Sequence, residues 1–175
     1  MKLSSKLSYF AIPLLLVGGA VTYKVLDAPP KVEEILIPEN RVQINFLLSE
    51  FNISGECIPE DVADKILQHH IVPMQRVRNK INIPIWASVK SSYRDVNWEI
   101  YRGRNGASEH VFAGKGAVDW TCADYENNKD IFLEAILKYT EYSRIAIYDN
   151  YIHCDYKETA SGKREIYNSN WQLQK

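Results

Sequence analysis

The sequence predicts an α+β fold, in which helices flank a small, mostly antiparallel sheet. Two observations predict this class. Segments with helical spacing of apolar residues do not alternate strictly with strand-like segments, and three strand-like stretches lie together near the end of the chain. The chain has 175 residues and is 46% hydrophobic, which suits one domain that buries its own core.

The first predicted helix begins at Pro59, because Glu60 and Asp61 then place acidic side chains in its first turn. Apolar residues follow at helical spacing: Val62, Ile66, Ile71, Met74 and Val77. Pro73 has no backbone N–H, so we expect it to kink this helix or to split it in two.

The remaining elements follow in chain order. Apolar residues recur at every second position over 83–89, which predicts a strand with one buried face. Asp95 is expected to cap a short helix that runs through Tyr101. A loop at 103–108 and a strand at 116–121 follow. A helix is expected at 130–139, with four residues facing inward: Ile131, Ala135, Ile136 and Tyr139. The chain then has three expected strands, at 144–148, 151–157 and 163–168, with a turn at 160–162 between the last two.

Residues 1–26 are predicted to be a signal peptide or a signal anchor. Lys2 and Lys6 precede the uncharged run Leu7–Tyr23, which is short for a hydrocarbon core of about 30 Å. Cleavage after Ala20, a permanent anchor and a weak anchor that later releases all remain open. Residues 27–44 are predicted to be a linker and 45–175 the folded domain, which we expect to be exported, either periplasmic or membrane-anchored and facing away from the cytoplasm.

The composition narrows the function classes. With 21 Lys+Arg against 22 Asp+Glu the net charge is −1, which argues against nucleic-acid binding through a broad basic face. The three cysteines allow at most one disulfide, and we expect partly buried thiols instead: Cys57, Cys122 and Cys154. The four tryptophans could line a groove for a glycopeptide, but most are expected in the core: Trp86, Trp98, Trp120 and Trp171. The adjacent His69 and His70 are expected to be a solvated pair on a helix surface.

The candidate chemistry lies in the second half of the chain. His110 follows a predicted loop, Asp119 lies in the next predicted strand, and His153 lies in a later one. Because alternate side chains of a strand share a face, Tyr151, His153 and Asp155 should point the same way. A His-Asp-His set can bind zinc and leave a fourth position for water, although the same spacing also suits structural polar residues.

Three ordered motifs strengthen the zinc hypothesis: SSYR (91–94), SEHVFAGKGAVDW (108–120) and YIHCDY (151–156). Together they resemble the zinc peptidase family of D-Ala-D-Ala carboxypeptidases and L-Ala-D-Glu peptidases. The upstream sequence over 48–85 is similar to the branch of that family common in phages and bacteria. The resemblance therefore covers about residues 45–157. The hedgehog signalling domain has the same scaffold, and the resemblance therefore implies the hedgehog/DD-peptidase zinc-binding fold for 45–175.

The resemblance implies that His110, Asp119 and His153 ligate zinc. It also implies that Ser108 steadies the first ligand or the substrate. Arg94 falls on the family's arginine, whose guanidinium can hold a substrate carboxylate or a developing oxyanion. From the residue alone, a surface ion pair is the other reading of Arg94.

The sequence departs from the family pattern in two places. His110 and Asp119 are separated by eight residues (VFAGKGAV), where many members have six. The usual carboxylate three residues before the last His is replaced by Asn150, which cannot accept a proton. We expect Asp155, and next Asp149, to act as the general base, with orientation of a ligand as the alternative role of Asp155.

These observations predict a zinc-dependent peptidase that cuts stem peptides or cross-bridges of peptidoglycan. The alternative is a non-catalytic zinc module that binds peptidoglycan or a protein partner, and a structural protein of a phage particle is a third reading. Peptidoglycan peptides are the expected partners and the expected state is a monomer. The scissile bond stays open among three: the D-Ala-D-Ala carboxypeptidase bond, a D,D-endopeptidase bond and the L-Ala-D-Glu bond.

Overall fold

The computed structural model describes residues 44–52, 57–88 and 92–174. The predicted signal or anchor at 1–26 lies outside these residues, as do most of the linker and Val89 of the first predicted strand. Among the described residues, no helix combines the length and the apolar character needed to cross a membrane.

In the described part of the chain, five strands form one mixed sheet in the order β1-β2-β4-β3-β5. Their bounds are Ile85–Ala87 for β1, Ala117–Cys122 for β2, Arg144–Ile147 for β3, Ile152–Asp155 for β4 and Glu165–Asn168 for β5. The pairs β1–β2, β2–β4 and β3–β4 are antiparallel, and β5 runs parallel to β3. The predicted α+β class with a mostly antiparallel sheet is therefore confirmed.

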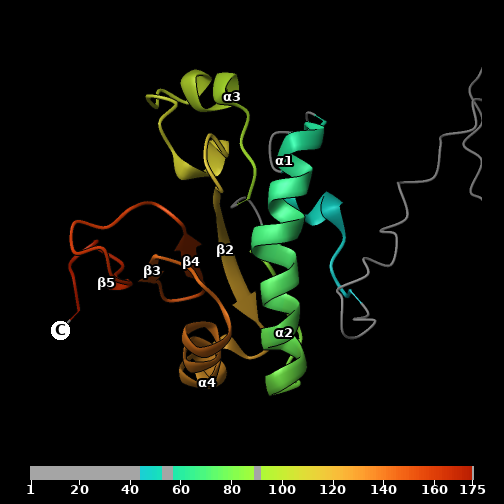
Figure 1. Ribbon diagram of the computed structural model, residues 1–175, viewed down its shortest axis with the longest axis vertical. Coiled ribbons are helices and arrows are strands. Elements are labelled where there is room, and N and C mark those ends of the chain that lie inside the picture. The colour runs from blue at the N-terminus through green and yellow to red at the C-terminus, as the bar shows by residue number, and fades with distance from the viewer. Residues whose placement is uncertain (1–43, 53–56, 89–91, 175) are drawn as a thin grey trace, which may run out of the picture. The chain divides into compact units, whose positions relative to one another are not determined.

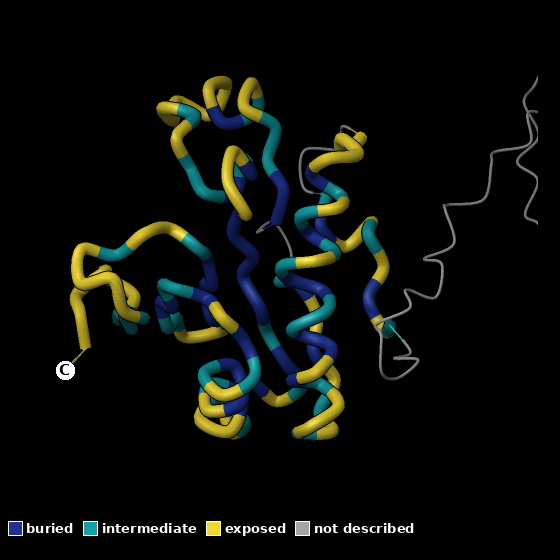
Figure 2. Tube along the Cα trace, viewed as in Figure 1, coloured by how far each residue is buried: buried dark blue, intermediate teal, exposed yellow. Residues whose placement is uncertain are grey.

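The paired strands β2 and β4 are the most buried part of the sheet, as Figure 2 shows. In their register, Asp119 of β2 pairs with His153 of β4. Since directly paired residues project to the same face, the register brings these two polar side chains together. Both strands are otherwise lined by buried apolar residues such as Val118, Trp120 and Ile152, which keeps the register fixed.

Helix α1 (Glu60–Lys65), a π-helical segment (Ile66–Ile71) and α2 (Val72–Ile81) follow one another without a break, and Figure 1 shows them as one column beside β2. Pro73 lies in the first turn of α2, where a missing N–H is tolerated. The helical run is not split at Pro73, and the structure instead has a π-helical segment that ends just before it.

His70 is fully buried, so the prediction of a solvated histidine pair is wrong. Its Nδ1 lies 3.2 Å from the Tyr142 hydroxyl and its Nε2 lies 2.9 Å from the Lys115 carbonyl oxygen. His70 stands four residues after Ile66 and four before Met74, both fully buried. Helical spacing therefore places His70 on the inward face, and the pattern was available in the sequence.

Helix α4 (Tyr125–Tyr139) begins five positions before the predicted 130–139. Its buried face carries Phe132, Ala135 and Ile136, whereas Ile131 is 54% exposed. The prediction of Ile131 as an inward residue is wrong, because the neighbouring Phe132 occupies that face. The short helix α3 (Val96–Tyr101) is confirmed, and the Asp95 carboxylate accepts the backbone N–H of Asn97 at 2.8 Å.

Two expectations about side-chain burial need correction. Of the four tryptophans only Trp120 lies in the core, while Trp86 and Trp171 are exposed and Trp98 is half-buried. The three cysteines are free thiols as expected, and Cys122 and Cys154 are buried, so the expectation is wrong only for Cys57, which is exposed. The core is completed by phenylalanines from the N-terminal part of the domain, since Phe46 and Phe51 pack edge-on against Trp120.

Candidate metal centre

Asp119 and His153 form the base of the site. Their strands are hydrogen-bonded neighbours, and His153 Nδ1 lies 2.6 Å from Asp119 Oδ1. Both side chains are almost fully buried. The sheet register alone therefore places a ring nitrogen and a carboxylate oxygen within reach of one ion.

His110 approaches from a short 3-10 turn, Glu109–Val111. Ser108 begins this turn, and its Oγ accepts the His110 backbone N–H at 3.3 Å. The His110 carbonyl oxygen accepts the Arg94 backbone N–H at 2.9 Å, which ties the two loop motifs to each other. His110 Nε2 thereby lies 3.6 Å from Asp119 Oδ1.

The three side chains are brought together as predicted. One ligand atom from each of His110, Asp119 and His153 lies within 4.8 Å of the others, and all three residues are buried. Two imidazole nitrogens and one carboxylate oxygen are a donor set found in metal sites. This group could hold a metal ion.

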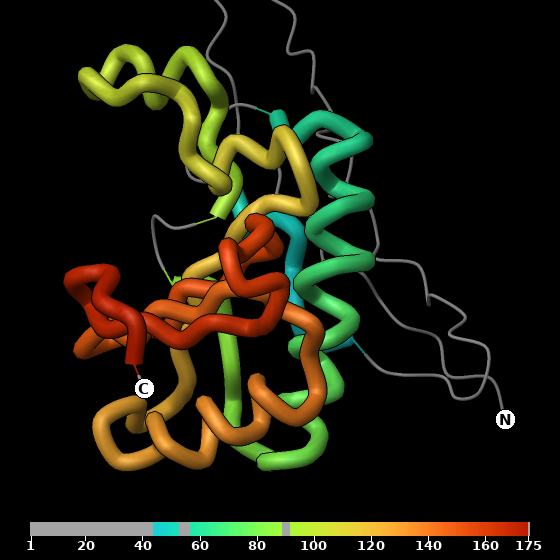
Figure 3. Tube along the Cα trace, turned by 60° about the vertical axis from the view of Figure 1, so that its left-hand side comes forward, coloured from blue at the N-terminus to red at the C-terminus, as the bar shows by residue number. Residues whose placement is uncertain are grey.

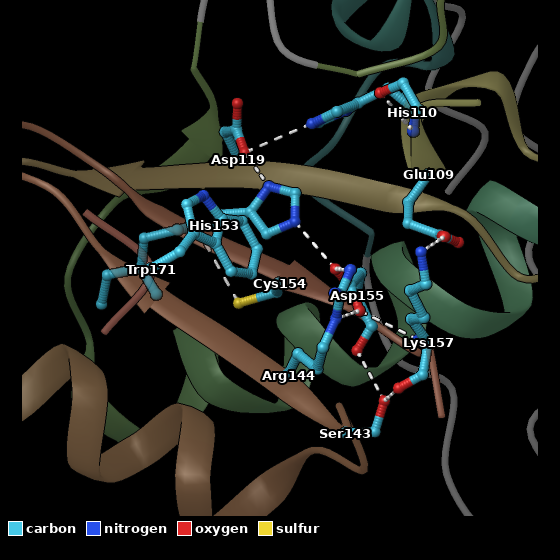
Figure 4. Close-up of polar contacts among 12 residues, drawn as sticks. Glu109, His110, Asp119, Ser143, Arg144, His153, Cys154, Asp155, Lys157 and Trp171 are labelled. Carbon is cyan, nitrogen blue, oxygen red and sulfur yellow. Dashed lines mark hydrogen bonds and ion pairs between the residues drawn. The ribbon is translucent and has the colours of Figure 1, made fainter. Parts of the chain in front are cut away.

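Each histidine uses its other ring nitrogen in a supporting contact. His110 Nδ1 lies 3.2 Å from the Ser92 carbonyl oxygen, and His153 Nε2 lies 2.9 Å from Asp155 Oδ2. Metal-ligating histidines generally have such partners, which fix the tautomer and the ring plane. Figure 4 shows the chain Asp119–His153–Asp155–Arg144 running through the site.

Asp155 is fully buried and held from three sides. Arg144 donates from Nε to Oδ1 at 2.9 Å and from Nη2 to Oδ2 at 2.5 Å, and the Lys157 backbone N–H donates to Oδ1 at 2.9 Å. A carboxylate in these contacts orients His153, which is the alternative role considered for Asp155. The shared face of His153 and Asp155 is confirmed by their contact.

Burial and hydrogen bonding act in opposite directions on the pKa values of the site. Burial lowers the pKa of His110 to about 3. Burial also lowers the pKa of His153, but its hydrogen bonds to Asp119 and Asp155 outweigh burial and raise it to about 9. Hydrogen bonds from His153 and Arg144 lower the pKa of Asp155 to about 2 against the effect of burial. A metal ion bound at His153 Nδ1 would take the place of a proton on that nitrogen.

The three candidate ligands line a pocket of about 360 Å³. Its other lining residues are Arg94, Ala107, Ser108, Glu109, Arg144, Tyr148, Tyr151, Lys157 and Trp171. Of the carboxylates that line it, Asp119 is a candidate ligand and Glu109 is not. Glu109 forms an ion pair with Lys157 at 3.4 Å.

Arg94 lines the pocket as the resemblance implies, but it is also ion-paired. Its Nη1 lies 3.2 Å from Glu99 Oε1, and Arg104 contacts the same oxygen at 2.8 Å. Glu99 is buried, so this pair is not a solvated surface contact. Arg94 Nε is buried without a hydrogen-bond partner in the described part of the structure.

The structure does not bring the expected proton carriers to the pocket wall. Asp155 and Asp149 are absent from the pocket lining, and Asp149 is exposed. Asn150 is also exposed, and its carbonyl oxygen accepts the Thr121 hydroxyl at 2.8 Å. That Asp155 or Asp149 acts as the general base stays a prediction, and the absence of both residues from the pocket lining argues against it.

Glu109, Arg144 and Trp171 are among the pocket residues that the sequence did not assign to the site. Glu109 lies inside the Ser-x-His motif beside a predicted ligand, so its position was a usable signal. Arg144 meets Asp155 only through the β3–β4 register, and Trp171 arrives from beyond the segment that carries the resemblance. No local pattern indicated either of these two contacts.

A search of protein-family models, of curated proteins and of solved structures finds no match to this chain. What the site can do is therefore argued from its donors, its supporting contacts and its pocket.

Proposed function

We propose that this protein is a zinc-dependent peptidase that hydrolyses peptide bonds in the stem peptides or cross-bridges of peptidoglycan. One observation carries the proposal: three buried protein ligands converge within 4.8 Å and line an open pocket. Structural zinc sites close the ion with four protein ligands, whereas catalytic sites keep a position for water. Peptidoglycan as the substrate is supported by the motif resemblance and by the predicted export of the domain.

The proposal includes the hedgehog/DD-peptidase fold. Support comes from the positions of the three candidate ligands along the sequence of strands. The first histidine precedes β2, the aspartate lies in β2 and the last histidine lies in β4, with the two strands paired. The resemblance places the same three ligand types in the same order.

A zinc ion bound here supplies a nucleophile at neutral pH and polarises the scissile carbonyl. The protein contributes orientation: Asp155 holds His153, the Ser92 carbonyl oxygen holds His110, and burial excludes bulk water from the ligands. Arg94 binds negative charge on the substrate, either a carboxylate or the oxyanion that develops on the carbonyl oxygen. Its contact with buried Glu99 fixes the guanidinium at the pocket.

The proton must be carried from the nucleophile to the leaving amine by a group at the pocket. We assign this step to a Glu109 carboxylate oxygen, because among the described pocket residues it is the carboxylate that is not a candidate ligand. Its ion pair with Lys157 keeps it on that wall. Glu109→Gln should then lower kcat far more than it changes zinc content.

The test is direct. Purified full-length protein is incubated with muropeptides, with and without a chelator, and the products are identified by mass spectrometry. Loss of a terminal alanine or a split at one defined bond, abolished by the chelator and restored by zinc, is the expected result. Intact muropeptides from folded, zinc-loaded protein would overturn the proposal.

A non-catalytic zinc module that binds peptidoglycan or a protein partner is the second candidate. It is favoured by Asn150 in place of the family's carboxylate and by the burial of Asp155. Three variants separate the candidates: Glu109→Gln, Asp149→Asn and Asp155→Asn, each assayed for turnover and for zinc content. The peptidase requires that at least one of them loses turnover while it keeps zinc.

A further inference from the structure

The C-terminal segment folds back on β5 and presents one residue, Trp171, to the pocket. The Asn168 side-chain oxygen accepts the backbone N–H groups of Asn170 and Gln172, both at 3.0 Å. Leu173 then bridges to Tyr167 of β5. Figure 3 shows this segment, in red, lying across the strands drawn in orange. The Trp171 backbone N–H donates to the Asn168 carbonyl oxygen at 3.0 Å, so the turn reverses the chain and Trp171 closes it.

Trp171 is fixed by four contacts. Its indole N–H donates to the Tyr148 hydroxyl at 3.0 Å, and its ring lies edge-on to the His153 ring with centroids 5.4 Å apart. The Arg144 guanidinium lies 5.0 Å from the ring centroid, and the Tyr167 ring lies 5.3 Å away. Figure 4 shows Trp171 beside His153 and Arg144.

Despite these contacts, the side chain is not buried as a core tryptophan would be. Trp171 is 40% exposed, lines the pocket and has a φ of 58°. Left-handed backbone is unusual for a bulky side chain and costs about 1 kcal/mol or more. A large ring held at a pocket wall at this cost, with 40% of its surface exposed, is arranged for a ligand rather than for the core.

We propose that Trp171 is a specificity-determining residue, whose exposed ring contacts the apolar side chain of the peptide residue that flanks the scissile bond. This inference rests on the proposed peptidase function. The bond to be cut must lie at the candidate ligands, and the Trp171 ring is in contact with one of them, His153. A neighbouring residue of the peptide therefore reaches the ring.

The ring favours a small aliphatic group. Tyr148 and Tyr151 line the same pocket and stack with ring centroids 4.4 Å apart, so an aromatic surface continues from Trp171. All three candidate bonds of peptidoglycan have alanine on at least one side. A single methyl group in an apolar pocket changes kcat/KM about tenfold or more.

The experiment uses the full-length zinc-loaded protein and matched synthetic stem peptides that carry alanine or glycine next to the cleaved bond. Trp171→Ala, Trp171→Phe and Trp86→Ala are compared with wild type. Trp86 is the matched control, because it is 38% exposed and does not line the pocket. Zinc affinity is measured for each variant by competition with a chelating dye.

Wild type should prefer the alanine peptide over the glycine peptide about tenfold, and Trp171→Ala should abolish most of that preference. Trp171→Phe should retain it, and Trp86→Ala should behave as wild type. Zinc affinity should be the same in all four proteins, which separates substrate contact from a structural effect on His153.

Two results overturn the inference while the proposed function stands. One is a Trp171→Ala enzyme that keeps the alanine preference, and the other is an equal loss on both peptides together with weakened zinc binding. If wild type neither cleaves nor binds any of the peptides, as measured by titration calorimetry, the proposed function fails and the inference fails with it.

Discussion

Two buried histidines in this protein have opposite surroundings. His70 and His153 are both shielded from solvent, but the ring nitrogens of His70 contact a hydroxyl and a carbonyl oxygen, whereas those of His153 lie between two carboxylates. Burial lowers the pKa of His70 to about 3, and the hydrogen bonds to Asp119 and Asp155 raise that of His153 to about 9.

The comparison teaches that the partners of a buried histidine, rather than its burial, decide what it does. A neutral imidazole bonded to neutral groups serves the core. An imidazole between two carboxylates is held in one ring orientation, with one nitrogen supported by Asp155 and the other facing Asp119, as a metal ligand requires. Four predictions test this contrast, from the largest expected effect to the smallest.

The largest effect is expected from removal of a ligand. His153→Ala should abolish stoichiometric zinc binding, because two remaining ligands do not complete a site, whereas His70→Gln should keep it. Metal content after dialysis against a weak chelator, read by atomic emission, checks both variants. Equal zinc content in the two variants would remove the distinction between the histidines.

The second effect concerns the loop 112–116, which contacts His70 and leads into β2. Gly116 has a φ of 83°, and a Cβ there would lie 2.1 Å from the Phe112 ring, which itself packs against His70. Gly116→Ala should lower the free energy of unfolding by about 3 kcal/mol or more. Urea denaturation measures it.

Gly114→Ala is the matched control for this loop, because a Cβ at Gly114 meets no atom within 4 Å. We expect it to change the free energy of unfolding by less than about 0.5 kcal/mol. Similar destabilisation by both variants would mean that the loop tolerates neither residue, and the specific clash at Gly116 would not be the cause.

The third effect tests the carboxylate that distinguishes His153. Asp155→Asn leaves the shape intact but removes the charge that orients His153 and pairs with Arg144. Zinc affinity should fall by about 10- to 100-fold, as measured by dye competition. Asp149→Asn, an exposed position, is the control and should leave zinc affinity unchanged.

The smallest effect, taken per pH unit, is a pH dependence from His70. The pKa of His70 is lowered in the folded protein, so below about pH 6.5 the unfolded chain binds more protons than the folded chain. The free energy of unfolding therefore falls as the pH falls from about 6.5 toward 3. The slope attributable to His70 should reach at most about 1.4 kcal/mol per pH unit. Urea denaturation between pH 7 and 4 measures it as the difference between wild type and His70→Gln.

The difference isolates His70 because the other titrating groups near it are present in both proteins. These are His69, His110, Lys115, Tyr142, Tyr156 and Asp155. Parallel stability curves for the two proteins would show that the His70 proton does not contribute, and would contradict the contrast with His153.

Much of the site was predictable because it depends on local rules. The alternation of a strand placed His153 and Asp155 on one face, and the short loop before a predicted strand placed His110 near Asp119 in the chain. The same rules failed for His70, although its spacing from Ile66 and Met74 indicated the core. That the chain is a zinc peptidase remains a proposal that the motifs and the pocket support.

Local sequence patterns were enough to indicate which residues can be ligands, which faces of the elements they share, and the α+β class. Only the tertiary structure decided the pairing of Asp119 with His153, the ion pair of Arg144 with Asp155, and the arrival of Trp171 at the pocket. The physical reason is that periodicity acts over a few residues, whereas strand register and chain reversal depend on packing between segments far apart in the chain.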